Sequence, residues 1–540
     1  MRITVLFGLV LTILHLGQAV AQPFVKSWDK AFGGSADDNV ESFFLNSDKG
    51  YIIGGSSLSG ISADKSQPNW DPTLQTQDFW IIRTDSNGTK IWDKRFGGTS
   101  SDLILEINPT SDGNIIAGGQ SYSAATGDKS QPNWDPNLGS QDYWIIKIDQ
   151  MGNKLWDKRF GGTLFELFES VEETSDGGFL VAGSSFSPIS GDKTVDNWGG
   201  WDYWVVKTDS LGSKLWDKRY GGTGDDLLTD AVATPDGGGL LGGYTKSKFS
   251  GDHTAGNQGA FDYWVVRIDG NGDLLWEKNF GGNYNDWLFA LSPVSGGGFL
   301  LGGQSFSEQS GDKSEPNHDP NPTGSDYWVV KIDDNGNKIW DRTIGADEVE
   351  SLSYIYETSD NDFLLSGESY SDFNGDKTED NLGIEQTWVV KIDSSGNILW
   401  DKTIFTNGHD EKGSAIPLND LCFTVVNYTA ADTGGYKSEF TRGDGDYWMV
   451  KLCDITVGID ELNSATLNIF PNPTKNNIQI SGLLTLSDYS FVIRSVRGEI
   501  VKNGKLTTNT INLTDISKGV YILQLKSKNQ SIYKKFIKLE

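Results

Sequence analysis

Residues 216–222 read WDKRYGG, and near-copies of this heptapeptide return along the chain as WDKAFGG, WDKRFGG and WEKNFGG. A second landmark, DYW or its variants DFW and QTW, alternates with it. The tryptophans that open the first landmark, spaced by 60 or 64 residues, are Trp28, Trp92, Trp156, Trp216, Trp276, Trp340 and Trp400. Those that end the second are Trp80, Trp144, Trp204, Trp264, Trp328, Trp388 and Trp448. Seven copies of two landmarks at a steady period indicate a repeat architecture.

Each repeat contains four strand-like runs that are separated by turn signals. In residues 164–222 the runs are LFELFESVEET, GFLVAGSSF, DYWVVKTD and SKLWDKRYGG, and the joints SDGG and DSLG supply the residues that tight turns require. The DYWVVK run is apolar on both faces, as a covered central strand is, whereas KLWDKRY alternates and fits a strand nearer the rim. Four antiparallel strands in each of seven units predict an all-β fold, a seven-bladed β-propeller over residues 22–455.

The two landmarks do not begin and end together in the repeat region. The chain starts its repeats with SWDKAFGG before any DYW, and it ends them with DYWMVKLCD, which no WDK copy follows. We therefore predict that the strand around Trp28 supplies the missing outer strand of the blade that ends near Asp454. An open stack would instead need polar caps at both ends, and none is evident in the sequence.

The first residues of the chain and its charge distribution indicate a signal peptide and a domain boundary. Residues 1–21 combine one basic residue, an apolar stretch and small residues, which predicts a secretory signal peptide. No later segment approaches the roughly 20 apolar residues of a transmembrane helix. Residues 22–455 carry 33 Lys and Arg against 68 Asp and Glu, whereas residues 467–540 carry 11 against 4. The change of sign marks a domain boundary, with residues 456–466 as the linker, and so acidic a body repels nucleic acid.

The chain has two cysteines, Cys422 and Cys453, on segments that we predict to be neighbouring strands of the last repeat. An exported protein can oxidise them. A disulfide would stabilise the final hairpin by about 2 to 3 kcal/mol because it restricts the unfolded chain. Two separate thiols are the alternative, since the sequence does not show that the Cβ atoms approach each other.

The long loop before each DYW landmark is the most informative stretch for a ligand. All six regular loops leave the same pair of strands, so we expect them on one face of the disc. Each holds an asparagine that is followed by Trp, Gln258, His318 or Leu382; the candidate binding residues are Asn69, Trp70, Asn133, Trp134, Asn197, Trp198, Asn257, Asn317, His318 and Asn381. Amide and carboxylate groups beside exposed indoles suit sugars. The alternative is architectural, with Asn and Asp capping the loop and Trp packing on a neighbouring blade.

Signatures of catalysis are scarce. The histidines that follow the predicted signal peptide are His253, His318 and His409, each in a different repeat, and no HExxH, GxSxG or Cys/His metal spacing occurs. We therefore expect a protein that is not an enzyme and that needs no metal or cofactor. An enzyme would require residues that break the repeat and converge in space, and the sequence singles out none.

From residue 467 onward the chain has alternating apolar residues, glycine-bearing turns, no Trp and a basic balance, which predicts a small separate Ig-like β-sandwich. Its FPNPT, RGE and KGVYIL stretches and its lysine-rich end resemble the type A C-terminal sorting domain of the type IX secretion system of Bacteroidota. The residues that carry this resemblance are Pro471, Asn472, Pro473, Gly498, Gly519, Tyr521, Lys534, Lys535 and Lys538. The resemblance implies translocation across the outer membrane by the type IX machinery, removal of the domain, and release or attachment to surface lipopolysaccharide. The repeats are also similar to propeller units of secreted proteins from that phylum.

These observations together predict an exported propeller that is secreted or held on the outer-membrane surface. We expect it to act as a non-catalytic binding or adhesion module, with a surface glycan or a protein as candidate ligand. The alternatives are a polysaccharide-processing enzyme on the same scaffold and a purely structural surface protein. The fold by itself does not decide among them.

Overall fold

The computed structural model describes residues 24–135, 139–319, 324–419, 421–454, 468–481, 489–495, 500–526 and 531–539. The predicted signal peptide and linker lie outside these residues. Within them the secondary structure consists of β-strands without a helix. None of the described residues forms a helix long and apolar enough to cross a membrane.

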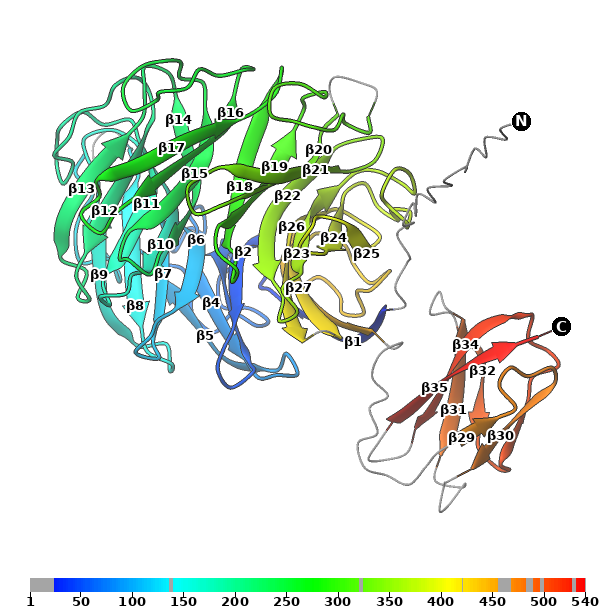
Figure 1. Cartoon of the computed structure of the whole chain (residues 1–540). Coiled ribbons are helices and arrows are strands. Elements are labelled where there is room, and N and C mark those ends of the chain that lie inside the picture. The colour runs from blue at the N-terminus through cyan, green and yellow to red at the C-terminus, as the bar shows by residue number, and fades with distance from the viewer. Residues whose placement is uncertain are drawn as a thin grey trace, which may run out of the picture.

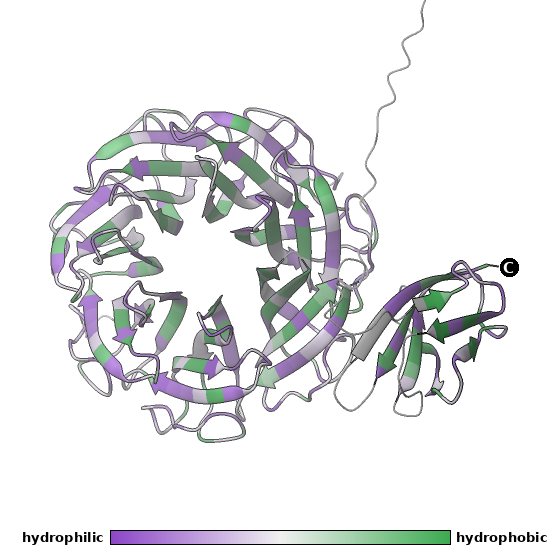
Figure 2. Ribbon diagram, turned by 60° about the horizontal axis from the view of Figure 1, so that its bottom comes forward, coloured by the Kyte–Doolittle hydropathy of each residue, from purple (hydrophilic) through white to green (hydrophobic). Residues whose placement is uncertain are grey.

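Residues 24–454, as far as the structure describes them, form seven four-stranded antiparallel sheets that are arranged as the blades of a closed ring (Figures 1 and 2). The first three blades comprise β2 (Asp38–Leu45), β3 (Tyr51–Ser57), β4 (Asp78–Thr84) and β5 (Lys90–Phe96); β6 (Asp102–Pro109), β7 (Ile115–Ser121), β8 (Asp142–Ile148) and β9 (Lys154–Phe160); and β10 (Glu166–Glu173), β11 (Phe179–Ser185), β12 (Asp202–Thr208) and β13 (Lys214–Tyr220). The next three comprise β14 (Asp226–Ala233), β15 (Gly239–Thr245), β16 (Asp262–Ile268) and β17 (Leu274–Phe280); β18 (Asp286–Pro293), β19 (Phe299–Ser305), β20 (Asp326–Ile332) and β21 (Lys338–Ile344); and β22 (Glu350–Glu357), β23 (Phe363–Ser369), β24 (Gln386–Ile392) and β25 (Ile398–Ile404). These sheets confirm the predicted repeat unit and its number.

The seventh blade closes the ring with both ends of the repeat region. It contains β26 (Asp410–Asn419), β27 (Cys422–Thr429) and β28 (Asp446–Asp454), and its outer strand is β1 (Phe24–Phe32). In the register of this antiparallel pair Val25 lies opposite Cys453. Cys453 is bonded to Cys422 on the adjacent strand, so the predicted disulfide is confirmed. The early WDK copy therefore belongs to the last blade, as its position in the sequence predicts.

The two landmarks meet inside each blade. The DYW tryptophans are completely buried, and in blade three Trp204 donates its indole N–H to Asp217 of the WDK stretch at 3.1 Å. The same bond recurs around the ring, with Glu277 in place of Asp in blade four and with Asp29 of β1 in blade seven. A large buried indole with a satisfied N–H contributes much apolar area at little polar cost. The repetition of the two landmarks is thus architectural.

The strand order places two kinds of connection on opposite faces of the disc. The first strand of each blade is innermost and contacts the neighbouring blades, and the fourth lies at the rim. Because the strands alternate in direction, the long loops between the second and third strands share one face with the connections between blades. The tight turns lie on the other. We call the first of these the long-loop face.

The C-terminal segment forms a separate two-sheet sandwich. One sheet contains β29 (Asn468–Phe470), β30 (Asn477–Ser481) and β33 (Thr510–Asn512); the other contains β31 (Ser490–Ser495), β32 (Ile500–Lys505), β34 (Gly519–Lys526) and β35 (Ser531–Lys538). Buried apolar side chains of both sheets, among them Ile478, Ile493 and Phe536, form its core. The predicted β-sandwich is confirmed.

Candidate binding face around the channel mouth

The predicted loop asparagines hold their own loops. Asn69 donates from Nδ2 to the carbonyl oxygens of Ser57 at 2.7 Å and Thr76 at 3.0 Å, and its Oδ1 accepts from Lys65 Nζ. Burial lowers the pKa of that lysine to about 8. In the other regular loops the asparagine side chain donates to an equivalent backbone carbonyl oxygen. These asparagines are Asn133, Asn197, Asn257, Asn317 and Asn381. Their amides are therefore used within the fold, which is the architectural alternative of the sequence analysis.

The loop tryptophans link neighbouring blades. Trp70 is 40% exposed, and its indole N–H binds Asp128 of the next blade at 2.9 Å. Arg95 covers the indole at 4.5 Å from the ring centroid and binds the same carboxylate at 2.7 Å. We call such a group of three side chains a clasp.

Clasps of related chemistry continue around the disc. The Trp–Arg–Asp set recurs at Trp134, Arg159 and Asp192. At Trp198 the indole lies 4.7 Å from Arg219, and Asp252 accepts from Arg219 and from the N–H of Gly221. Gln258 binds Asp312 in the next interface, and His318 lies 3.5 Å from Asp376 in the one after it. The sixth loop departs from this pattern, because Leu382 is exposed there. The candidate loop residues are thus brought to one face, where the asparagines hold their own loops and the tryptophans and His318 lie at contacts between blades.

A closed ring of backbone hydrogen bonds runs around the inner part of the disc on the long-loop face. In every blade the residue directly after the second strand donates its N–H to the residue directly before the first strand, as Phe186 does to Phe165 at 2.9 Å. The residue directly before the third strand accepts from the first strand of the following blade, as Trp201 does from Asp226 at 2.7 Å. These three positions in seven blades constitute what we call the mouth ring. Because backbone hydrogen bonds hold the mouth ring, the residue type at each of its positions can differ from blade to blade.

The side chains of the mouth ring differ from blade to blade. The residues before the first strands are Asp37, Ser101, Phe165, Asp225, Asn285, Val349 and His409. Those after the second strands are Leu58, Tyr122, Phe186, Lys246, Phe306, Tyr370 and Ala430. Those before the third strands are Gln77, Gln141, Trp201, Phe261, Ser325, Glu385 and Gly445. Residues that differ between the repeats are therefore brought to one ring, although no motif in the sequence singles them out.

Aromatic side chains gather on the mouth ring of blades three to five and on the strand residues beside it. We define the aromatic belt as Phe186, Trp201, Tyr244, Phe261, Trp287 and Phe306. Successive ring centroids within it lie 5.3 to 6.1 Å apart in four pairs. The pair of Tyr244 and Trp287 spans the interface between two blades. Phe186 is 44% exposed and the other five are partly exposed. The belt thus consists of two half-buried aromatic groups, the pair of Phe186 and Trp201 and the set of the other four rings.

Carboxyl groups lie on or beside the mouth ring of blades six, seven and one. We define the acidic rim as Asp37, Glu368, Glu385 and Glu411. His409 lies between two of them, with Nδ1 3.1 Å from Glu385 and Nε2 2.5 Å from Glu411. Burial and a hydrogen bond shared with Glu368 raise the pKa of Glu385 to about 8. In the part of the chain that the structure describes, no three His, Cys, Asp or Glu side chains are arranged to hold a metal ion.

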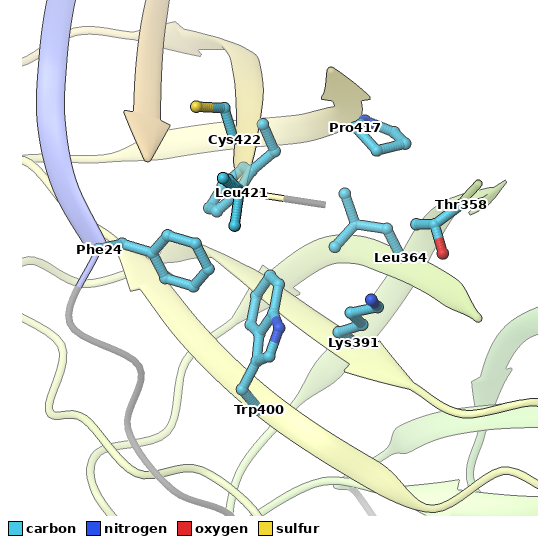
Figure 3. A pocket seen from close by; sticks show the side chains of 9 residues that line it. Phe24, Thr358, Leu364, Lys391, Trp400, Pro417, Leu421 and Cys422 are labelled. Carbon is cyan, nitrogen blue, oxygen red and sulfur yellow. The ribbon is translucent and has the colours of Figure 1, made fainter. Parts of the chain in front are cut away.

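The pocket drawn in Figure 3 lies elsewhere, between blades six and seven. Phe24 of the closing strand packs there on Trp400 at 4.6 Å, and Leu364 and Cys422 also line it. Its charged group, Lys391, is paired with two aspartates. The pocket forms where the closing strand β1 packs against blade six, and few polar groups in it point toward a ligand.

The predicted sorting motif lies where the sandwich joins its last strand. Asn472 donates to the carbonyl oxygen of Lys535 at 3.0 Å and accepts from the N–H of Ile537 at 2.8 Å, so it fixes β35. The peptide bonds before Pro471 and Pro473 are both cis.

A second part of that motif packs the sandwich core. Tyr521 stacks on Phe536 with centroids 5.7 Å apart and donates its hydroxyl to the carbonyl oxygen of Ser517. Gly519 begins β34, and Gly498 lies outside the described residues.

Residues 468–539 match the family model described as the secretion system C-terminal sorting domain. The sandwich is a secretion system sorting domain. A chain that carries this sorting domain is exported and is secreted or attached to the cell surface, through contact of the sorting domain with the type IX secretion machinery. The interpretation of the tail from its motifs is confirmed.

Relatives of the propeller are distant. The regulatory protein FlaEY of Caulobacter vibrioides is 27% identical over 208 residues, which are 37% of this chain and 22% of that protein, so the match spans less than a quarter of the relative's length. Among solved structures, PorZ of Porphyromonas gingivalis, a surface component of the type IX secretion system, is 11% identical, covering 94% of this chain and 71% of that one with a TM-score of 0.33. The Pan2 WD40 domain of Neurospora crassa is 9% identical, covering 80% and 97%, with a TM-score of 0.43.

Proposed function

We propose that the propeller of this exported protein is a non-catalytic binding module and that its ligand docks on the aromatic belt. The observation that carries the proposal is the mouth ring itself. Its backbone is held by the same hydrogen bonds in all seven blades, while its side chains change at each position. A constant scaffold that presents variable side chains around one opening is the arrangement that binding proteins use to combine rigidity with specificity.

A carbohydrate chain is the ligand class that the belt favours. Indole and phenyl faces stack on the C–H faces of sugars, and a half-buried ring loses little conformational freedom when a ligand covers it. The belt has rings on three blades, four of them in contact across blades four and five, which suits a ligand of several units. The loop tryptophans form the second candidate surface, although each of their indoles is already covered on one side by an arginine.

The carboxyl pair of the acidic rim supports binding over glycoside hydrolysis. Glycosidases keep their two carboxyl groups about 5 Å apart or more, so that the sugar or a water molecule fits between them. Glu368 and Glu385 share a hydrogen bond instead. We accordingly propose no catalytic role for this pair.

The test is a glycan array with the full chain and two sets of variants. The belt variant Trp201→Ala, Trp287→Ala should lose binding, whereas the loop variant Trp70→Ala, Trp134→Ala, Trp198→Ala should keep it. Because both belt tryptophans are half-buried, Phe186→Ala at an exposed belt position serves as a milder second variant, and thermal unfolding checks each fold. Loss of binding in the loop variant alone would move the site to the clasps. Failure of the wild-type chain to bind any glycan would contradict the carbohydrate proposal.

A further inference from the structure

An ion pair connects the two aromatic groups of the belt. Trp201 of blade three packs on Phe186 and donates its main-chain N–H to Oδ1 of Asp225 in blade four at 3.3 Å. Asp225 is paired in turn with Lys246, whose ammonium group lies 5.9 Å from the ring centroid of Phe261. Phe261 belongs to the second aromatic group. An unbroken series of contacts therefore leads from the rings of blade three to those of blades four and five.

Both members of this ion pair are open to a ligand. The side chain of Lys246 is 45% exposed and that of Asp225 is 29% exposed. Asp225 takes one of the three donors of the ammonium group, while Lys246 and the N–H of Trp201 take two of the roughly four acceptor sites of the carboxylate. Lys246 is the one lysine or arginine among the mouth-ring positions. The pair thus presents donors and acceptors together between two aromatic surfaces.

We propose that the ligand is a neutral glycan chain that bridges the two aromatic groups, with sugar rings on both of them and hydroxyl groups between them bonded to Asp225 and Lys246. This inference rests on the proposed function and names the substrate class of the same site. A hydroxyl group both donates and accepts, so neighbouring hydroxyls of one sugar satisfy the carboxylate and the ammonium group without separating them. The aromatic faces on either side then stack on the adjoining sugars.

A charged ligand fits this pair less well. A carboxylate would be attracted by Lys246 and repelled by Asp225, within a propeller whose residues 22–455 carry 33 Lys and Arg against 68 Asp and Glu. An ammonium group would compete with Lys246 for Asp225 and be repelled by Lys246. A proline-rich peptide also packs on aromatic rings, but its prolines lack the backbone N–H groups that Asp225 would accept. A neutral chain of hydroxyl-bearing rings meets none of these costs.

The experiment measures binding to the full chain by calorimetry. The neutral probes are the β-1,4-linked hexamers of glucose, mannose, xylose and N-acetylglucosamine, each compared with its own dimer. The charged probes are the β-1,4-linked hexamers of mannuronic acid and of glucosamine. We expect at least one neutral hexamer to bind about ten times more tightly than its dimer and than either charged hexamer. Because these comparisons use the unaltered protein, they do not depend on any variant folding.

A pair of lysine variants localises the effect. Lys246→Met keeps an unbranched apolar stem beside Phe261 and removes the donors, so it should weaken binding of the neutral hexamer about tenfold. Lys218→Met is the matched control, because the Lys218 side chain is 37% exposed and is paired with Asp273 at a tight turn. It removes the same charge and should leave binding unchanged. An equal loss in both variants would reduce the effect to net charge and overturn the inference.

The outcomes separate this inference from the proposed function. A dimer that binds as tightly as its hexamer, with binding abolished by Trp201→Ala, Trp287→Ala, would keep the belt as a glycan site and overturn the bridging chain. Tighter binding of a charged hexamer than of every neutral one would overturn the neutral ligand, and tighter binding of a proline hexapeptide would replace the sugar with a peptide. Binding of none of the four neutral hexamers would overturn the inference as well, and the glycan array would then decide on the belt alone.

Discussion

Trp70 donates its indole N–H to Asp128, which lies 58 residues further along the chain and in the next blade, at 2.9 Å. Arg95 binds the same carboxylate and covers the indole. Both residues of this pair belong to loops whose composition suggests ligand recognition. In the folded ring they fasten one blade to the next, and the half-buried aromatic belt with variable neighbours lies elsewhere on the same face.

The clasps should contribute measurably to stability. Trp134→Phe keeps an aromatic ring beside Arg159 but removes the hydrogen bond to Asp192, and we expect it to lower the free energy of unfolding by about 1 kcal/mol. Trp198→Phe is the matched control, because among the described residues that indole N–H has no hydrogen bond to Asp252. Urea unfolding would measure both. Equal losses in the two variants would show that the hydrogen bond contributes nothing beyond the ring.

Gly127 should be irreplaceable for a steric reason. Its φ is +63°, and an added Cβ would lie 2.3 Å from the carbonyl oxygen of Gly97 and 2.6 Å from the Trp70 indole nitrogen. Gly113 has a similar φ of +78° with open space around it. We expect Gly113→Ala to cost about 1 kcal/mol through the backbone alone and Gly127→Ala to cost about 1 to 3 kcal/mol more through overpacking. Comparable unfolding midpoints would contradict the clash.

The disulfide should stabilise the blade that closes the ring. Cys422 and Cys453 enclose a loop with a sequence separation of 31, for which restriction of the unfolded chain amounts to about 3.7 kcal/mol. We expect Cys422→Ser, Cys453→Ser to lower the unfolding midpoint, and a reductant to lower the wild-type midpoint in the same way. A wild-type midpoint insensitive to reductant while the double variant is destabilised would assign the loss to packing of the serines.

Stability should fall as the pH rises through neutrality. Burial raises the pKa of Asp78 and of Asp202 to about 7, well above the usual value for an aspartate. A group whose pKa is raised on folding stabilises the fold while it is protonated, and that contribution is lost as the pH rises through the folded pKa. We therefore expect a lower free energy of unfolding at about pH 8 than at about pH 5.

A matched pair of variants assigns that pH dependence. Asp202→Asn should flatten the profile between these pH values. Asp217→Asn should not, because hydrogen bonds with Lys214 and Thr194 outweigh its burial and lower the pKa of Asp217, which places its titration below this window. Denaturant unfolding monitored by tryptophan fluorescence across the range would decide. A flat wild-type profile would show that the buried aspartates are not protonated in this range.

The architecture could be predicted because the sequence pattern of one blade recurs in seven repeats. Trp204 and Asp217 stand at equivalent places in other blades, and a feature that returns at every period reports the packing that every blade shares. The first WDK copy precedes any DYW copy, and the last DYW copy has no WDK copy after it. Because each blade of a ring needs the same number of strands, this order predicted that Trp28 lies in the last blade. The FPNPT stretch likewise predicted the sorting domain, through residues such as Asn472 that hold its last strand.

The candidate site could not be predicted in the same way, because its residues share no motif. Trp201, Phe261 and Glu385 occupy one equivalent position in three blades and have nothing in common as side chains. The sequence nevertheless contained a signal for these positions. They directly flank the repeated strands, and their residue type changes from repeat to repeat while the adjacent strand residues recur. Only the strand register shows that they lie on one ring.

The sequence by itself determined the blade, the number of blades, the closure of the ring and the route of export, since each depends on local patterns that recur or occupy a fixed place in the chain. Tertiary structure alone decided which side chains meet. Tyr244 and Trp287 pack together although 43 residues separate them, because two inner strands of neighbouring blades lie side by side. The asparagines that looked available to a ligand are bonded within their loops for a related reason, since buried backbone carbonyls require donors and the nearest amide supplies them.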